Sequence, residues 1–134
     1  MWKSALILAL SFTHVSAQSA SRTVRPKVLI MEATAFARAP QPTAAGTEVH
    51  DGTVAADPRI LPLGTRIAVA GVPGYNGNYL VTDTGAAVKG MHIDIYVPTT
   101  VEAKRFGTKR ARVTVLRMGK GPADARRKDT ARKD

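Results

Sequence analysis

The sequence has no cysteine, few aromatic residues and no long apolar run. Without cysteine, the chain has no disulfide scaffold, no thiol nucleophile and no cysteine-type zinc site. No apolar stretch reaches the roughly 18 residues of a membrane span, so we expect no transmembrane anchor. With 134 residues, of which 44% are hydrophobic and 5% aromatic, the chain has enough apolar side chains for one modest core. We therefore expect one domain.

The first 17 residues have the pattern of a secretory signal. Lys3 supplies a short basic region, residues 5–12 form an apolar run, and residues 15–17 (Val-Ser-Ala) form a small-residue cleavage site. We expect a mature chain that begins at Gln18 and has a polar lead-in at residues 18–26. The pattern predicts a secreted protein, located in the periplasm or associated with the outer membrane or cell wall.

The net charge of +10 is concentrated toward the C-terminus. Residues 18–103 contain seven basic and seven acidic residues, whereas residues 104–134 contain twelve basic and three acidic ones. Residues 119–134 lack leucine, isoleucine, valine and aromatic residues, which is typical of a solvated, disordered tail. Such a tail either keeps the protein in solution or attracts anionic envelope polymers. It has no stacking aromatic residue, and the chain carries an export signal, so we expect no nucleic-acid partner.

The intervening domain, residues 27–118, consists of short segments with the period of β-strands. Strands are predicted at residues 27–36, 52–56, 65–70, 79–82, 91–97 and 112–117, with a loop rich in glycine at 71–78. Thr99 and Glu102 form a capping box and Gly107 suits a C-cap, so a helix is predicted at residues 100–106. These elements predict a mainly β fold, a small six-stranded barrel with one short helix.

Asp94 lies in the middle of a predicted strand, where aspartate is disfavoured. The alternation places it on one face with His92 and Tyr96. The opposite face of the strand carries Met91, Ile93, Ile95 and Val97. The polar face is either exposed to solvent or lines a cleft.

Two further aspartates lie at turns. Asp57 precedes a proline and by itself is typical of a turn, and Asp83 opens an Asp-Thr-Gly segment that suits an Asx-turn. Lys89, in a turn with Gly90, is a candidate counter-ion or substrate contact. The three histidines have no metal-ligand spacing, so we expect neither a metal nor another cofactor.

Five segments together, residues 52–58, 61–65, 83–90, 93–96 and 103–107, resemble the three-aspartate (3D) domain family. The resemblance covers residues 28–117, and the aspartates that give the family its name are here Asp57, Asp83 and Asp94. This domain is similar to the catalytic barrel of the membrane-bound lytic transglycosylase A family and to stationary-phase survival proteins. The resemblance implies a double-psi β-barrel that cleaves peptidoglycan glycan strands and leaves 1,6-anhydro-muramyl ends. The larger transglycosylases carry a second domain, which we do not expect in this chain.

A lytic transglycosylase needs a carboxyl group that first donates a proton and then accepts one, so its pKa must lie well above about 3.9. Asp94 is the candidate for this acid and base, because apolar neighbours and a nearby Asp83 both raise a carboxyl pKa. The ionised Asp83 is expected to stabilise positive charge, and Asp57 to position substrate or hold its turn. The candidate substrate-binding residues are Thr84, Gly85, Lys89, His92 and Tyr96.

Two other functions fit parts of the sequence. Residues 83–86 (Asp-Thr-Gly-Ala) also match the active-site signature of single-lobe aspartic proteases, although no second apolar-Gly-Arg segment follows. A non-catalytic, expansin-like module that binds peptidoglycan also fits a single barrel with a basic tail.

Overall fold

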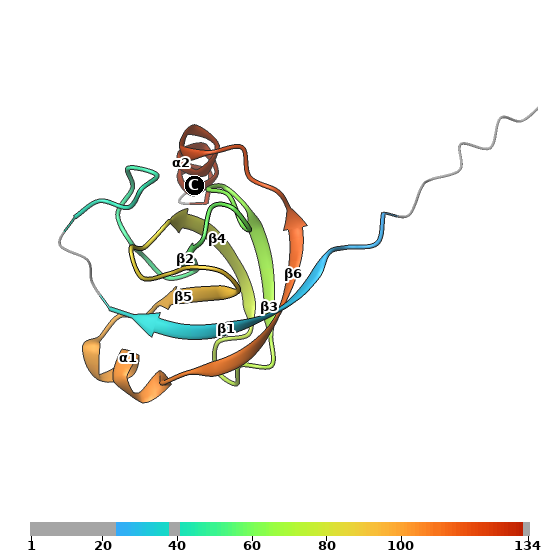
Figure 1. Cartoon of the computed structure of the whole chain (residues 1–134). Helices are drawn as coiled ribbons and strands as arrows, with labels where there is room; N and C mark the ends of the chain where they lie inside the picture. Colours follow the sequence, from blue (N-terminus) through green and yellow to red (C-terminus); the bar gives the residue numbers. More distant parts are fainter. Residues whose placement is uncertain (1–23, 38–40, 133–134) are drawn as a thin grey trace, which may run out of the picture.

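Six strands close into a barrel in the spatial order β1-β5-β2-β4-β3-β6 (Figure 1). The structure is a computed structural model that describes residues 24–37 and 41–132; the predicted signal and most of the lead-in lie outside these residues. In chain order, the elements are β1 (Val28–Phe36), β2 (Thr53–Ala56), β3 (Arg66–Ala70), β4 (Gly77–Asp83), β5 (His92–Tyr96), α1 (Thr100–Phe106), β6 (Lys109–Arg117) and α2 (Pro122–Thr130). The predicted six-stranded barrel is confirmed.

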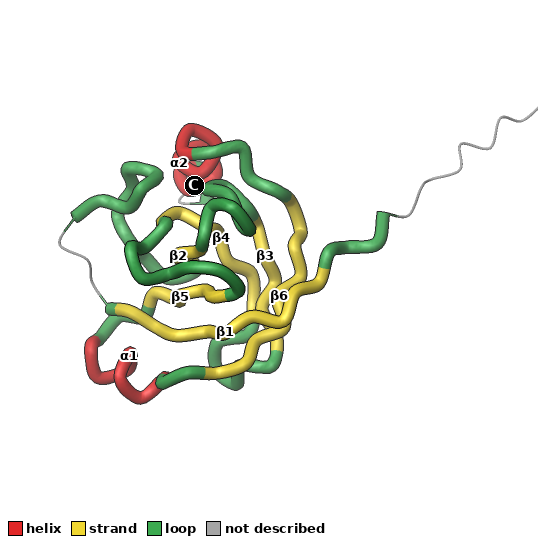
Figure 2. Tube along the Cα trace, viewed as in Figure 1, coloured by secondary structure: helices red, strands yellow, loops and turns green. Residues whose placement is uncertain are grey.

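The barrel mixes parallel and antiparallel pairs. The pairs β1–β5 and β2–β4 are parallel, and the other four neighbouring pairs are antiparallel. Several connections join strands that are not neighbours in the barrel. For example, β1 and β2 are separated by β5, and β4 and β5 are separated by β2, so the loop between β4 and β5 passes over an end of the barrel (Figure 2).

Alternate residues of each strand point into the barrel and form the core. On β5, Ile93 and Ile95 are fully buried, whereas the intervening residues are half-buried. Further core residues from the strands are Met31, Ala33, Val54, Ala56, Ile67, Val69, Val81, Ala111, Val113 and Val115. Met91, expected on the inward face, precedes β5 and is 44% exposed, because the turn at Gly90 takes it out of the strand alternation.

Helix α1 forms as the capping pattern predicts. The side chain of Thr99 accepts a hydrogen bond from the backbone N–H of Glu102, and Gly107 ends the helix with φ of 63°. The buried Phe106 packs edge-to-face on Tyr75, with ring centroids 4.9 Å apart. This contact attaches the helix to the turn between β3 and β4.

Helix α2 corrects two predictions, that residues 119–134 are disordered and that the fold has one helix. Residues 122–130 form a helix that packs against β4. Asp124, Ala125, Lys128 and Asp129 are buried in it. Because polar groups occupy the buried face, an apolar pattern could not reveal this helix.

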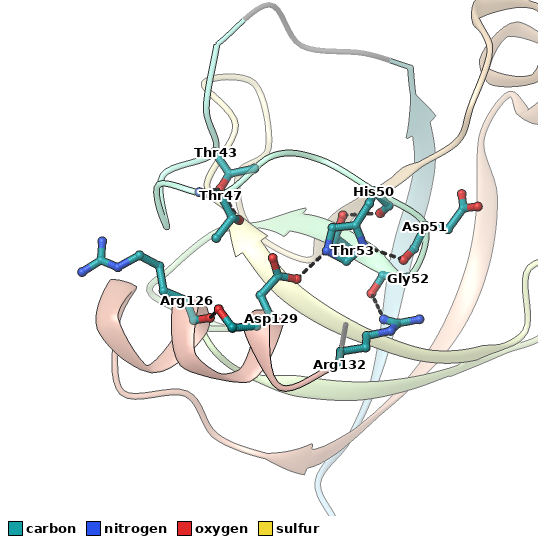
Figure 3. Close-up of polar contacts among 10 residues, drawn as sticks. Thr43, Thr47, His50, Asp51, Gly52, Thr53, Arg126, Asp129 and Arg132 are labelled. Atoms are coloured by element: carbon teal, nitrogen blue, oxygen red, sulfur yellow. Dashed lines mark hydrogen bonds and ion pairs between the residues drawn. The ribbon is translucent and has the colours of Figure 1, made fainter. Parts of the chain in front are cut away.

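Besides the buried Ala125, hydrogen bonds hold α2 in place. Lys128 Nζ donates to the carbonyl of Gly64 at 2.6 Å and to Asp124 Oδ2 at 2.7 Å. Figure 3 shows Asp129 facing His50 (Nε2 to Oδ1, 2.5 Å) and the Arg132 guanidinium donating to the carbonyl of Gly52 (3.1 Å). The helix thus fixes the segment that leads into β2. In the described part of the chain, neither helix is long and apolar enough to cross a membrane.

Candidate active site on the outer face of β5

The outer face of β5 presents His92, Asp94 and Tyr96, all half-buried. Their positions follow from strand alternation, since Ile93 and Ile95 point into the core. The sequence analysis grouped these three residues correctly on one face. The face is neither fully exposed nor closed, so its polar groups are accessible and partly shielded from water.

Strand β1 lies beside this face and supplies a hydrogen-bond partner. Thr34 is in register with Asp94, and its hydroxyl donates to Asp94 Oδ1 at 2.9 Å. The same hydroxyl oxygen lies 2.7 Å from His92 Nε2. A threonine hydroxyl has one hydrogen, so when Asp94 is ionised the proton of the second contact must lie on His92 Nε2. The three side chains then form a chain of donors that ends at the carboxylate.

The pKa of Asp94 is raised above its ordinary value. Burial is the largest cause, because it disfavours the charged carboxylate, and the hydrogen bond from Thr34 and the charge of His92 act in the opposite direction. The sequence predicts a raised pKa for Asp94 from apolar surroundings and from repulsion by Asp83. The structure gives burial as the source and assigns no contribution to Asp83.

Asp83 ends β4 and is separated from Asp94 by strand β2. Both aspartates are in register with Ala55, one on each side of it. Neighbouring strands are about 4.8 Å apart, so the two Cα atoms are about 10 Å apart. Asp83 Oδ1 accepts hydrogen bonds from the backbone N–H groups of Thr84 (2.8 Å) and Ala44 (3.1 Å). The carboxylate therefore ties the start of the β4–β5 loop to the segment before β2.

Asp57 is buried and ion-paired. Its Oδ2 accepts from Arg59 Nη2 at 2.7 Å and from the backbone N–H of Gly90 at 2.9 Å. The side-chain hydrogen bond with Arg59 is the largest cause that holds the pKa of Asp57 well below its ordinary value, followed by the backbone bonds. With 2% exposure it has no access to a ligand. This geometry fits the predicted structural role of Asp57, because the bond to Gly90 fixes the end of the β4–β5 loop directly before β5.

The β4–β5 loop, residues 84–91, forms a wall beside the aspartates. Gly85 adopts φ of 51°, and a Cβ atom there would lie 2.6 Å from Val88 Cγ2 and 3.5 Å from the Cβ of Ala55. Val88 is buried, so the loop folds back over β2. Thr84 and Gly85 are half-buried and Lys89 is exposed. Of the predicted substrate-binding residues, these three lie on the loop and the other two on β5.

The structure adds Thr34 and Phe36 to the site. Phe36 is in register with Tyr96, and the two rings pack edge-to-face with centroids 5.8 Å apart. Sequence alternation along β1 places both residues on its outer face, but the parallel pairing of β1 with β5 that brings them to Asp94 has no sequence signal. An apolar ring face beside a carboxyl group is a suitable surface for a sugar.

Within residues 24–37 and 41–132, no three His, Cys, Asp or Glu side chains gather so that they could hold a metal ion. A surface hollow of about 420 Å³ lies along β1 and β6, and none of the three aspartates lines it. The site around Asp94 is therefore an open face bordered by a loop rather than a deep cavity.

Asp57 directly follows β2, Asp83 ends β4 and Asp94 lies on β5. Residues 52–117 match the model of the family described as the 3D domain. The family resemblance seen in the sequence is confirmed.

Two curated relatives come from Bacillus subtilis (strain 168). The cell wall-binding protein YocH is 36% identical over 78 residues, which are 55% of this chain and 26% of the relative. The putative cell wall shaping protein YabE is 31% identical over 120 residues, which are 78% of this chain and 28% of the relative. The chain thus spans just over a quarter of the length of each.

Solved structures are similar to the barrel. A Clavibacter michiganensis expansin in complex with cellohexaose aligns with a TM-score of 0.52 at 18% identity, over 72% of this chain and 54% of the expansin, and this likeness concerns the fold alone. The MltA structure from Escherichia coli aligns with a TM-score of 0.49 at 27% identity, over 61% of this chain and 29% of MltA.

Proposed function

We propose that this protein cleaves peptidoglycan glycan strands as a lytic transglycosylase, with Asp94 as the acid and base. The observation that carries the proposal is the environment of Asp94: a half-buried carboxyl with a raised pKa on an accessible face. A carboxyl with a raised pKa keeps its proton closer to neutral pH, as the first step requires.

In the first step, protonated Asp94 gives its proton to the glycosidic oxygen, and the bond from that oxygen to C1 breaks. Positive charge develops at C1 and the ring oxygen of the muramyl sugar. In the second step, ionised Asp94 takes the proton of the C6 hydroxyl of the same sugar, and the C6 oxygen bonds to C1. The products are a new free hydroxyl and a 1,6-anhydro end, and no water is consumed.

The neighbouring groups have supporting roles. Thr34 donates to the ionised form of Asp94, so it stabilises the carboxylate that the first step leaves behind. Tyr96 and Phe36 provide a ring surface for sugar contacts. Asp83 lies two strands away from Asp94, across Ala55, and its charge favours positive charge at C1. Asp57 acts as a positioning residue through the loop that it fixes.

The names of the two relatives support a substrate in the cell wall, since one is called cell wall-binding and the other cell wall shaping. With the N-terminal signal pattern, this supports action outside the cytoplasm. Intact-mass analysis of the exported protein is expected to show a chain that begins at Gln18. Retention of Met1 on the exported chain would contradict the signal assignment.

A non-catalytic peptidoglycan-binding module is the second candidate. The name of the cell wall-binding relative favours it, and so does the strand that separates Asp83 from Asp94, because it leaves Asp94 without a second carboxylate in contact. The two candidates predict the same binding but different products.

The deciding experiment incubates the chain from Gln18 onward with purified sacculi and analyses the soluble fraction by mass spectrometry. We expect 1,6-anhydro-muropeptides from the wild type and none above background from Asp94→Asn. Co-sedimentation with sacculi measures binding of both proteins in parallel. Binding without anhydro products from the wild type would reject the enzyme in favour of the binding module.

A further inference from the structure

A surface hollow of about 420 Å³ lies where β1 meets β6. Ile30, Met31, Glu32, Thr108, Lys109 and Arg110 line it. Nothing in the catalytic assignment uses these residues. The hollow contains apolar surface from Ile30, which is 47% exposed, and charged groups of both signs.

The strand register connects this hollow to the candidate active site. Glu32 on β1 is in register with His92 on β5 and with Arg110 on β6. The three residues thus form a row across three strands, about 10 Å from end to end at the Cα atoms. Asp94 follows His92 by two residues on the same face, about 7 Å along the strand. The hollow therefore begins about 8 Å from the reacting residue, measured between the Cα atoms of Glu32 and Asp94.

The charged groups of the hollow are available to a ligand. Among the described residues, neither Glu32 nor Arg110 forms an ion pair within 4.0 Å, although the two are in register. Arg110 is exposed, and Lys109, which is half-buried, has its Nζ 5.4 Å from the ring centroid of Phe106. An arginine guanidinium matches a carboxylate through two parallel hydrogen bonds. A ligand with carboxylates and an amine would complement both the positive and the negative side chains of the hollow.

We infer that this hollow binds the peptide stem of the glycan strand, with Arg110 and Lys109 on its carboxylates and Glu32 opposite its amine. The inference rests on the proposed function, because peptidoglycan is the substrate in both. It adds a second binding site on the protein, for the peptide stem, which would let the protein distinguish glycan strands with stems from bare ones. The glycan would lie across β5 and β1 over Asp94, and the stem would extend from the muramyl sugar toward β6. Strands that carry stems would bind more tightly than bare glycan.

The test compares intact peptidoglycan with glycan strands whose stems an amidase has removed. Binding of Arg110→Gln, Arg110→Lys and the wild type is measured on both polymers by co-sedimentation. The matched control is Lys120→Gln, which removes the same charge beyond the opposite end of β6, where the backbone N–H of Lys120 donates to Asp124 Oδ2. Unfolding curves for each variant confirm that the barrel is intact.

We expect Arg110→Gln to weaken binding to intact peptidoglycan about 10-fold, as the loss of one charged hydrogen-bonded contact does. Its binding to stem-free strands should equal that of the wild type, and Arg110→Lys should recover part of the loss. An equal loss on both polymers, or an equal loss for Lys120→Gln, would overturn the inference in favour of general charge attraction. Unchanged binding of Arg110→Gln would also overturn it. Release of anhydro products by the wild type, measured separately, reports on the proposed enzyme itself.

Discussion

Asp94→Asn is the most informative substitution, because it removes the ionisable proton and almost nothing else. Asparagine keeps the shape of the side chain and still accepts the hydrogen bond that Thr34 donates at 2.9 Å. Loss of a general acid and base typically lowers a rate by about 10²–10⁴-fold, or about 3–5 kcal/mol of barrier. We expect a loss of this size in release of 1,6-anhydro products, with binding to sacculi preserved.

The raised pKa of Asp94 also predicts the direction in which activity and stability change with pH. Because burial raises the pKa of Asp94, the acid form persists above the ordinary value of 3.8, and activity should fall as pH rises through the folded-state pKa. Ionising the buried carboxyl also costs stability over the same pH range, so Asp94→Asn should be more stable than the wild type at neutral pH.

Thr34→Val removes a hydrogen-bond donor that lowers the pKa of Asp94. The fall in activity with rising pH should therefore move to higher pH in this variant.

The assay is anhydro-product release from purified peptidoglycan at a series of pH values, with each variant verified as folded. Wild-type turnover by Asp94→Asn would remove Asp94 from the mechanism. A shift of the Thr34→Val profile to lower pH, or no shift at all, would show that the hydrogen bond does not control the reacting group.

Three further predictions concern the loop and helix α2. Asp57→Asn removes an ion pair and a backbone anchor of the β4–β5 loop, so a thermal melt should show lower stability, and product release should fall less than in the acid/base variant. The hydrogen-bonded ion pair with Lys128 lowers the pKa of Asp124 to about 2. The stability that this ion pair contributes should therefore be lost as pH falls from 3.8 through about 2. In denaturant titrations, the stability of Asp124→Asn should depend less on pH over this range than that of the wild type. Gly119→Ala places a Cβ atom 2.2–2.5 Å from backbone atoms of residues 63–65, and overpacking of this kind costs about 1–3 kcal/mol. An unchanged melting temperature would mean that the link to α2 does not pack there.

The sequence predicted the barrel well where local pattern determines structure. Strand alternation gave β5 and its two faces, and the capping residues gave helix α1 with the bounds that the structure has. Strand β4 begins at Gly77, inside the predicted loop, because its first residues pair with β3. Pairing across strands has no local signal, so the meeting of Thr34 with Asp94 could not be predicted.

Helix α2 shows the limit of a composition argument. Its buried face carries Asp124, Lys128 and Asp129, and Asp124 pairs locally with Lys128. The other partners of the latter two residues are distant: Lys128 bonds to the carbonyl of Gly64 and Asp129 to the ring of His50, each more than 60 residues away in sequence. Charged residues are almost never fully buried unless they are paired, and the distant pairs form only when the barrel has brought these segments together. A polar composition was therefore compatible with a docked helix.

The three aspartates look alike in the sequence and differ in their surroundings. Asp57 is held ionised by an adjacent guanidinium and by backbone N–H groups, whereas burial without such a partner moves the pKa of Asp94 in the opposite direction. Two carboxyl groups with pKa values shifted apart take different roles, since only the raised one retains a proton for transfer. Asp83 bonds only to backbone N–H groups within the described residues, where it ties two loops together. The environment of each carboxyl thus supports the proposed division of roles, in which the aspartate on the strand transfers the proton and those at the turns on either side support it.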